Sequence, residues 1–158
     1  MMTGRCIARD VSARQQGLAL VEAAIALPLL LLLLLPVVEF ARAFIQYSTL
    51  AHHGRAATRY LAERVIDDTT GVPELTGPLI AQAQQLAVYG QIAGGTNPVI
   101  PGLTTASVNA SLTPGGQVRL RIIDPYRPIV ASVLPTFGFG DDVPLAFSFN
   151  IDITMRPL

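Results

Sequence analysis

The 158-residue chain lacks lysine, has a single cysteine and carries few charges. All eleven basic residues are arginine, which excludes the Schiff-base and ammonium chemistry that lysine provides. Because Cys6 is the only cysteine, no internal disulfide can form, and the default expectation is an inert thiol. Charged residues make up 14% of the chain, the formal net charge is zero, and no run of arginines forms the basic face that binds phosphate backbones. We therefore expect no nucleic-acid partner.

One apolar run accounts for the shortage of charge. From Leu18 to Val38 the only charged residue is Glu22. About twenty helical residues, at roughly 1.5 Å each, match the roughly 30 Å hydrocarbon core of a bilayer. Pro28 and Pro36 fall within the run, but in lipid prolines more often kink a helix than end it. The run predicts a transmembrane helix over residues 18–38.

The charges before this run predict its orientation. Arg5, Arg9 and Arg14 stand in residues 1–17, where Asp10 is the only acid. The positive-inside rule then places the N-terminus in the cytoplasm and residues 39–158 outside it. We expect a single-pass membrane protein, with a short cytoplasmic leader and one extracytoplasmic domain.

Glu22 is the candidate functional residue of the apolar run. A carboxylate within a membrane segment is energetically costly and is a functional candidate by default. A second interpretation stays open: near the start of the helix, Glu22 can reach the headgroups or hold a proton.

The string RQQGLALVEAAIALP, from Arg14 to Pro28, resembles the type III signal of prepilins. This resemblance implies that a prepilin peptidase cuts after Gly17, leaving Leu18 first and Glu22 fifth in the processed chain. The Leu-Pro step, the leucine run and the residues from Glu39 to Arg42 resemble more narrowly the TadE-like pseudopilins of tight-adherence (Tad/Flp) pilus systems. Phe or Tyr commonly follows the glutamate in the prepilin family, whereas this chain has Ala23, a departure that weakens a match to the major pilin more than to minor ones.

The resemblance implies a function in assembly. The new amine of Leu18 would pair with Glu22 of the same or a neighbouring subunit through a charge-assisted hydrogen bond. The implied partners are the prepilin peptidase, other pilins or pseudopilins, the inner-membrane assembly platform and membrane lipid. Two alternatives stay open: a signal-anchored binding or adhesion domain that enters no filament, and a secretory signal cut after Ala43.

Residue spacing predicts two helices in an α+β domain, and the resemblance implies that this domain is pilin-like. Beyond Val38, apolar and small residues recur every three or four positions to about Val65, which indicates a long helix continuing the membrane segment. The members of this stripe are Phe40, Ala43, Tyr47, Leu50, Gly54, Ala57 and Leu61. In a second helix, Thr76 can cap the start, Pro78 suits the first turn and Gly90 supplies a stop. Its expected buried side consists of Leu79, Ala83, Leu86 and Val88.

The apolar period then changes to two, which is typical of strands. Alternation predicts strands over 105–112, 117–122 and 145–156, with a turn at 113–116 joining the first two as a hairpin. We expect an antiparallel sheet with one face covered by helix. Between the second and third strands, Ile129, Val130, Val133 and Leu134 stand at helical spacing and predict a short covering helix, followed by a loop that carries Phe137 to Gly140.

No residue pattern indicates catalysis, a cofactor or a metal. His52 and His53 are adjacent and would point about 100° apart on a helix, so they cannot share one ion without other ligands. The pairs at 67–68 and 141–142 are aspartates without the alternating oxygen ligands of a calcium loop. Ser132 and Ser148 lack a nucleophile-elbow context, and no glycine-rich phosphate loop occurs. We expect a protein that is not an enzyme.

Overall fold

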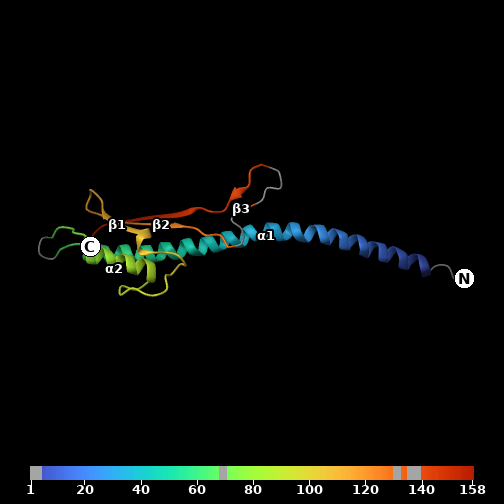
Figure 1. The fold of residues 1–158 in the computed structure, drawn as a ribbon, viewed down its shortest axis with the longest axis horizontal. Helices are drawn as coiled ribbons and strands as arrows, with labels where there is room; N and C mark the ends of the chain where they lie inside the picture. Colours follow the sequence, from blue (N-terminus) through green and yellow to red (C-terminus); the bar gives the residue numbers. More distant parts are fainter. Residues whose placement is uncertain (1–4, 68–70, 130–132, 135–139) are drawn as a thin grey trace. The chain divides into compact units, whose positions relative to one another are not determined.

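The computed structural model describes residues 5–67, 71–129, 133–134 and 140–158 (Figure 1). The fold is α+β, as the sequence predicts, with a long N-terminal apolar helix, a second helix and a small antiparallel sheet. In chain order the elements are α1 (Arg5–Arg64), α2 (Gly77–Tyr89), the 3-10 helix η1 (Thr105–Ser107), β1 (Val108–Leu112), β2 (Val118–Pro125), β3 (Val133–Leu134), β4 (Val143–Pro144) and β5 (Ser148–Met155).

The chain forms two compact units, an N-terminal unit, Met1–Phe40, and a C-terminal unit, Ala41–Leu158. Helix α1 contributes to both. It begins at Arg5, earlier than the Leu18 start expected from the apolar run, and Pro28 and Pro36 both lie inside it. The prolines therefore do not end the helix.

The C-terminal unit is a helical layer on a three-stranded sheet. The strand order is β1-β2-β5, and both pairings are antiparallel. Along β2 burial alternates strictly: Val118, Leu120 and Ile122 are buried, and the residues between them are exposed. The buried face meets α1, where a Cβ on Gly54 would lie 2.9 Å from Ile153 Cδ1. The absence of a side chain at Gly54 therefore lets α1 pack closely against the chain's own sheet.

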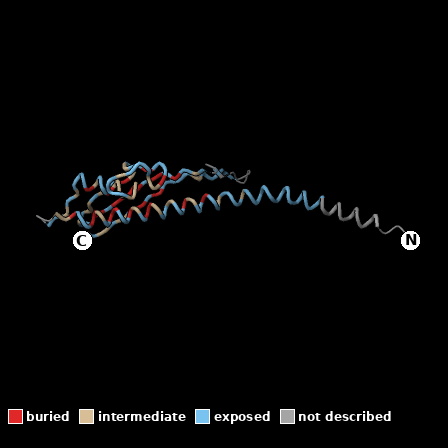
Figure 2. The backbone as a smooth tube through the Cα atoms, turned by 90° about the horizontal axis from the view of Figure 1, so that it is seen from below, coloured by how far each residue is buried: buried red, intermediate tan, exposed pale blue. Residues whose placement is uncertain are grey.

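The buried stripe of α1 is shifted from the expected one. Ala43, Leu50, Gly54, Ala57 and Leu61 are buried as predicted, and Figure 2 shows this burial along the C-terminal part of the helix. Phe40 and Tyr47 were expected in the stripe but are 63% and 47% exposed. Thr58 and Ala62 are buried instead. Thr58 satisfies its hydroxyl locally, since Oγ1 donates to the Gly54 carbonyl at 2.7 Å.

Helix α2 packs beside β1 on the covered side of the sheet. Its end agrees with the prediction, because Gly90 adopts a left-handed conformation (φ 70°) and its N–H donates to the Leu86 carbonyl at 3.0 Å. Thr76 occupies the N-cap position, but its side chain makes no capping hydrogen bond, so that part of the prediction is wrong. Gln84 Nε2 donates to the Val108 carbonyl at 2.9 Å and ties the helix to the first strand.

The β1–β2 hairpin is confirmed, with Leu112 opposite Val118 and the Thr113 N–H bonded to the Gln117 carbonyl at 2.8 Å. The first strand starts later than predicted. Residues 105–107 form η1, because the Ser107 N–H bonds back to the Thr104 carbonyl at 3.0 Å, and Ala106 is exposed. The prediction of a strand over 105–112 is therefore wrong for residues 105–107.

The covering helix predicted between β2 and β5 is wrong. Val133 and Leu134 lie in β3, which pairs with β4 as a separate two-stranded sheet. Pro128 and Pro135 bracket the helically spaced residues, and proline disfavours helix both before and after itself. Ile129 is 73% exposed, and Val130 and Phe137 to Phe139 lie outside the described residues.

Candidate membrane and assembly surface

Residues 17–38 of the N-terminal unit present an apolar helical surface in which no residue is buried. Its most apolar window has a mean hydropathy of 2.7 and none of its residues is buried. Leu30 and Leu33 are 64% and 65% exposed, and the tube in Figure 2 is coloured as exposed through almost all of this stretch. A surface of this length and composition is stable only in an apolar medium, as provided by a bilayer or by other apolar helices. This one N-terminal helix is long and apolar enough to cross a membrane.

Gly17 and Glu22, the residues singled out by the sequence, both lie in this exposed part of α1. Leu18 and Glu22 are four residues apart and therefore share one helix face. The Gly17–Leu18 bond is within the helix, so a peptidase would have to unwind it there. Glycine costs roughly 1 kcal/mol of helix propensity relative to alanine, which lowers the barrier to that unwinding. A Cβ on Gly17 would meet no atom within 4 Å.

The Glu39–Arg42 string marks the end of the fully exposed stretch. Glu39 is only 4% exposed, and Ala43 is part of the hydrophobic core. Phe40, which lies between these two residues in the sequence, and Phe44, which follows them, are exposed. From this point on, α1 has one buried side and one exposed side.

A small cleft lies in the C-terminal unit near the start of its part of α1. Its volume is about 270 Å³, and its polar lining includes Arg42, Gln46, Asp124 and Arg127. Burial raises the pKa of Asp124, and the nearby positive charge of Arg127 opposes that rise. Gly102, with φ 90°, lines the same cleft, and a Cβ there would lie 2.7 Å from Arg127 Nη1. Only glycine suits both that backbone and that contact.

Aromatic rings from three chain segments meet at the same end of the C-terminal unit. Tyr126 stacks on Phe147 with centroids 4.8 Å apart, and Phe147 meets Phe149 edge-on at 5.2 Å. Phe149 lies 6.0 Å from Tyr47 of α1. Tyr126 and Phe149 are buried, whereas Tyr47 and Phe147 are 47% and 43% exposed. The cluster therefore joins the helix to the ends of β2 and β5 and shows part of its aromatic surface to the outside.

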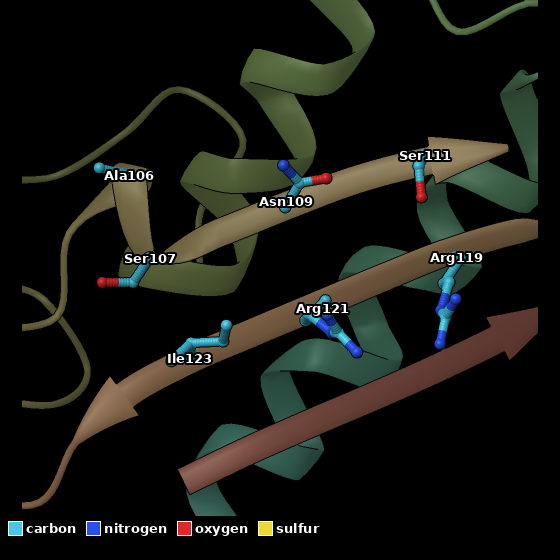
Figure 3. Close-up of a pocket in the computed structure, with 7 residues that line it drawn as sticks. All are labelled: Ala106, Ser107, Asn109, Ser111, Arg119, Arg121 and Ile123. Atoms are coloured by element: carbon cyan, nitrogen blue, oxygen red, sulfur yellow. The ribbon is translucent and has the colours of Figure 1, made fainter. Parts of the chain in front are cut away.

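The uncovered face of the sheet is polar. Figure 3 shows Asn109, Ser111, Arg119 and Arg121 along a shallow hollow of about 650 Å³, with helices behind the strands. Arg119 Nε donates to both carboxylate oxygens of Asp152, at 2.8 and 3.0 Å. This hydrogen bond, together with the charges of Arg119 and Arg121, holds the pKa of Asp152 below its usual range. Asp152 thus pairs with both arginines across the strands.

In the described part of the chain, the histidines and aspartates considered as metal ligands do not form one site. Within the described part of the chain, no group of three His, Cys, Asp or Glu side chains is placed to hold a metal ion. The rings of His52 and His53 lie 5.6 Å apart, edge to face, and the pKa of His53 is lowered by burial and by its neighbour. The Asp67 carbonyl accepts a hydrogen bond from the Gly71 N–H at 2.8 Å, and Asp68 lies outside the described residues.

Sequence reasoning missed the cleft and the aromatic cluster. Both depend on contacts between segments about 80 to 100 positions apart, which no local period reveals. A usable signal was the density of aromatic residues just before and within the third strand, because Phe147 and Phe149 alternate with polar residues.

The model of the TadE-like protein family matches residues 17–59. The match begins at Gly17, covers the exposed apolar stretch and continues into the buried part of α1. No curated protein and no solved structure matches the chain.

Proposed function

We propose that this chain is a minor pilin or pseudopilin that acts in assembly of a Tad-type pilus or secretion filament, because the TadE-like family model matches residues 17–59. Its role is contact and not turnover. The observation that carries the proposal is that the family match runs from Gly17, through a helical surface with nothing covering it, into the core of a folded domain. Such a helix can hold the subunit in the membrane and later pack among other pilin helices.

The proposal includes processing after Gly17 by a prepilin peptidase. The N-terminus lies in the cytoplasm, the C-terminal domain lies outside, and the inner-membrane assembly platform extracts the processed subunit. The positive charges in residues 1–17 and the low helix propensity of Gly17 support this arrangement.

Glu22 is proposed to recognise the N-terminal amine of the same or a neighbouring subunit. Replacing it with glutamine keeps its size and removes its charge, so Glu22→Gln is expected to leave membrane insertion and processing intact and to reduce piliation at least tenfold. Glu63→Gln is the matched control, because Glu63 is exposed near the end of α1 and pairs only with neighbouring Arg59 among the described contacts, at 2.9 Å.

Pilus counts by electron microscopy and sheared-fraction immunoblots measure the effect. Equal piliation in Glu22→Gln, Glu63→Gln and the unaltered chain would contradict the role given to Glu22.

A second candidate function is an anchored extracytoplasmic binding or adhesion domain that enters no filament. The polar hollow on the sheet favours it, because an uncovered sheet face can receive a ligand. Deleting the prepilin peptidase separates the two: a pseudopilin accumulates in its full-length form, whereas a signal-anchored domain is unchanged.

An exported soluble protein cut after Ala43 is the remaining alternative. Ala43 is buried within α1, so such a cut would fall inside a packed helix. Alkaline carbonate distinguishes this case, since it releases a soluble protein and leaves a spanning one in the membrane pellet.

A further inference from the structure

We propose that the aromatic end of the C-terminal unit rests in the lipid headgroup region, so that the folded domain itself contacts the bilayer. The proposal depends on the membrane-held α1 of the proposed function and goes beyond it. The surface concerned, called here the aromatic base, consists of the exposed rings of Phe44, Tyr47 and Phe147, which are backed by the buried rings of Tyr126 and Phe149.

The aromatic base is one continuous surface. Tyr47 meets Phe149 at 6.0 Å, Phe149 meets Phe147 at 5.2 Å, and Tyr126 stacks on Phe147 at 4.8 Å. Phe44 precedes Tyr47 by three residues on α1, which places the two on neighbouring positions of one helix face. Phe44 is 72% exposed, and Ile45 beside it is 63% exposed. Apolar groups gathered at one end of a domain mark a surface that meets something other than water.

Chain connectivity fixes the level of this surface relative to the membrane. Phe44 follows Val38, the last residue of the apolar run, by six positions. Residues 38–44 all lie within α1, so these six helical steps rise roughly 9 Å. The headgroup regions add roughly 5 to 8 Å on each side of the hydrocarbon core. Phe44 therefore lies no more than about 9 Å beyond the end of the apolar run, which places it in or next to the headgroups at any tilt of the helix.

The chemistry of the aromatic base and its surroundings suits that layer. Aromatic rings with a polar group, such as tyrosine, are enriched where hydrocarbon meets water. Arg42, Gln46 and Arg127 line the neighbouring cleft. Long arginine side chains can cover apolar surface while keeping their charge in the hydrated region. A helix from another subunit would also cover the apolar rings. Such a contact would not explain why the rings gather so close to the membrane segment.

The absence of tryptophan from the chain allows a direct test. Phe147→Trp, in the full chain reconstituted into phosphatidylcholine vesicles, introduces a single fluorophore into the aromatic base. Phosphatidylcholine with brominated acyl chains quenches from the lipid side, and iodide quenches from water. Leu30→Trp reports the membrane span, and Val72→Trp reports a surface beyond the far end of α1, where Val72 is 59% exposed.

The expected result is that brominated lipid quenches Leu30→Trp and Phe147→Trp, with blue-shifted emission, while only iodide quenches Val72→Trp. Phe44→Trp, at a more exposed position of the same surface, gives a second reading should Phe147→Trp disturb the fold. If Phe147→Trp and Phe44→Trp behave like Val72→Trp while Leu30→Trp stays lipid-quenched, the inference is overturned and the anchor of the proposed function stands.

Two other outcomes have separate meanings. Protection of both base reporters from lipid and iodide alike overturns the lipid assignment in favour of a contact between subunits. Iodide quenching of Leu30→Trp contradicts the membrane anchor and with it the proposed function.

Discussion

The two parts of α1 have similar secondary structure but opposite surroundings. Leu30 in the N-terminal unit is 64% exposed, whereas Leu61 in the C-terminal unit is fully buried. Leu61 packs in a core built from this chain's own sheet and second helix, and Leu30 has no such partner. The two parts of this helix therefore suit different environments. Apolar residues surround the first part completely and occupy only one side of the second part.

The largest expected difference in stability is between substitutions of these two leucines. Leu61→Ala removes buried methyl groups from a closed core and is expected to lower the free energy of unfolding by about 2–5 kcal/mol. Leu30→Ala removes the same atoms from a surface that the domain does not cover, so the expected change is within about 0.5 kcal/mol. Denaturant unfolding of the C-terminal unit, followed by near-ultraviolet circular dichroism in the full chain in micelles, measures both. Equal effects would mean that the two parts of α1 do not differ as described.

A second contrast uses small residues of α1. A Cβ on Gly54 would lie 2.9 Å from Ile153 Cδ1 and 3.1 Å from Ile122 Cδ1, so Gly54→Leu forces the helix away from the sheet. Overpacking of this kind costs about 1–3 kcal/mol. Ala56→Leu, at an exposed position two residues later, is the control and is expected to leave the unfolding midpoint nearly unchanged. A Gly54→Leu protein as stable as the control would show that α1 is not held against β2 and β5.

The third contrast concerns two aspartates of the sheet. Burial raises the folded-state pKa of Asp124, so its ionised form opposes folding, and stability falls as pH rises from the unfolded pKa, about 3.9, through the folded one. Asp124→Asn removes that penalty and is expected to raise the melting temperature modestly at pH 7, with a smaller gain at pH 4. Thermal unfolding at the two pH values measures the difference, and a loss of stability at pH 7 would contradict it.

The smallest expected effect comes from Asp152. Its folded-state pKa is lowered by the hydrogen bond from Arg119, so its contribution is present above about pH 3.9 and is lost as pH falls through the folded pKa. Because the pair is largely exposed, Asp152→Asn is expected to lower the melting temperature only slightly at pH 7 and by less at pH 2. A loss of similar size at both pH values would show that the ion pair is not its cause.

Local patterns predicted the features that local physics controls. The apolar run, the hairpin turn at 113–116 and the stop at Gly90 depend on residues within a few positions of one another, and the structure has all three. The same spacing rule failed at Ile129 to Leu134, because it ignores the prolines on either side.

The features that could not be predicted are non-local. Tyr47 was assigned to the buried stripe from its spacing, yet its ring meets only the edge of the sheet at Phe149 and stays half exposed. Whether a ring at that position is covered depends on where the ends of β2 and β5 fall against the helix. The proposed sites differ again: the roles proposed for Gly17 and Glu22 depend on a peptidase and on a processed N-terminus, so the fold of one subunit leaves these roles to experiment.

The most direct test of the account is the first residue of the chain recovered from carbonate-washed membranes, determined by N-terminal sequencing. A subunit processed after Gly17 and held by α1 begins with Leu18 and stays in the membrane pellet. A chain that begins with Phe44 and is found in the soluble fraction would contradict the account.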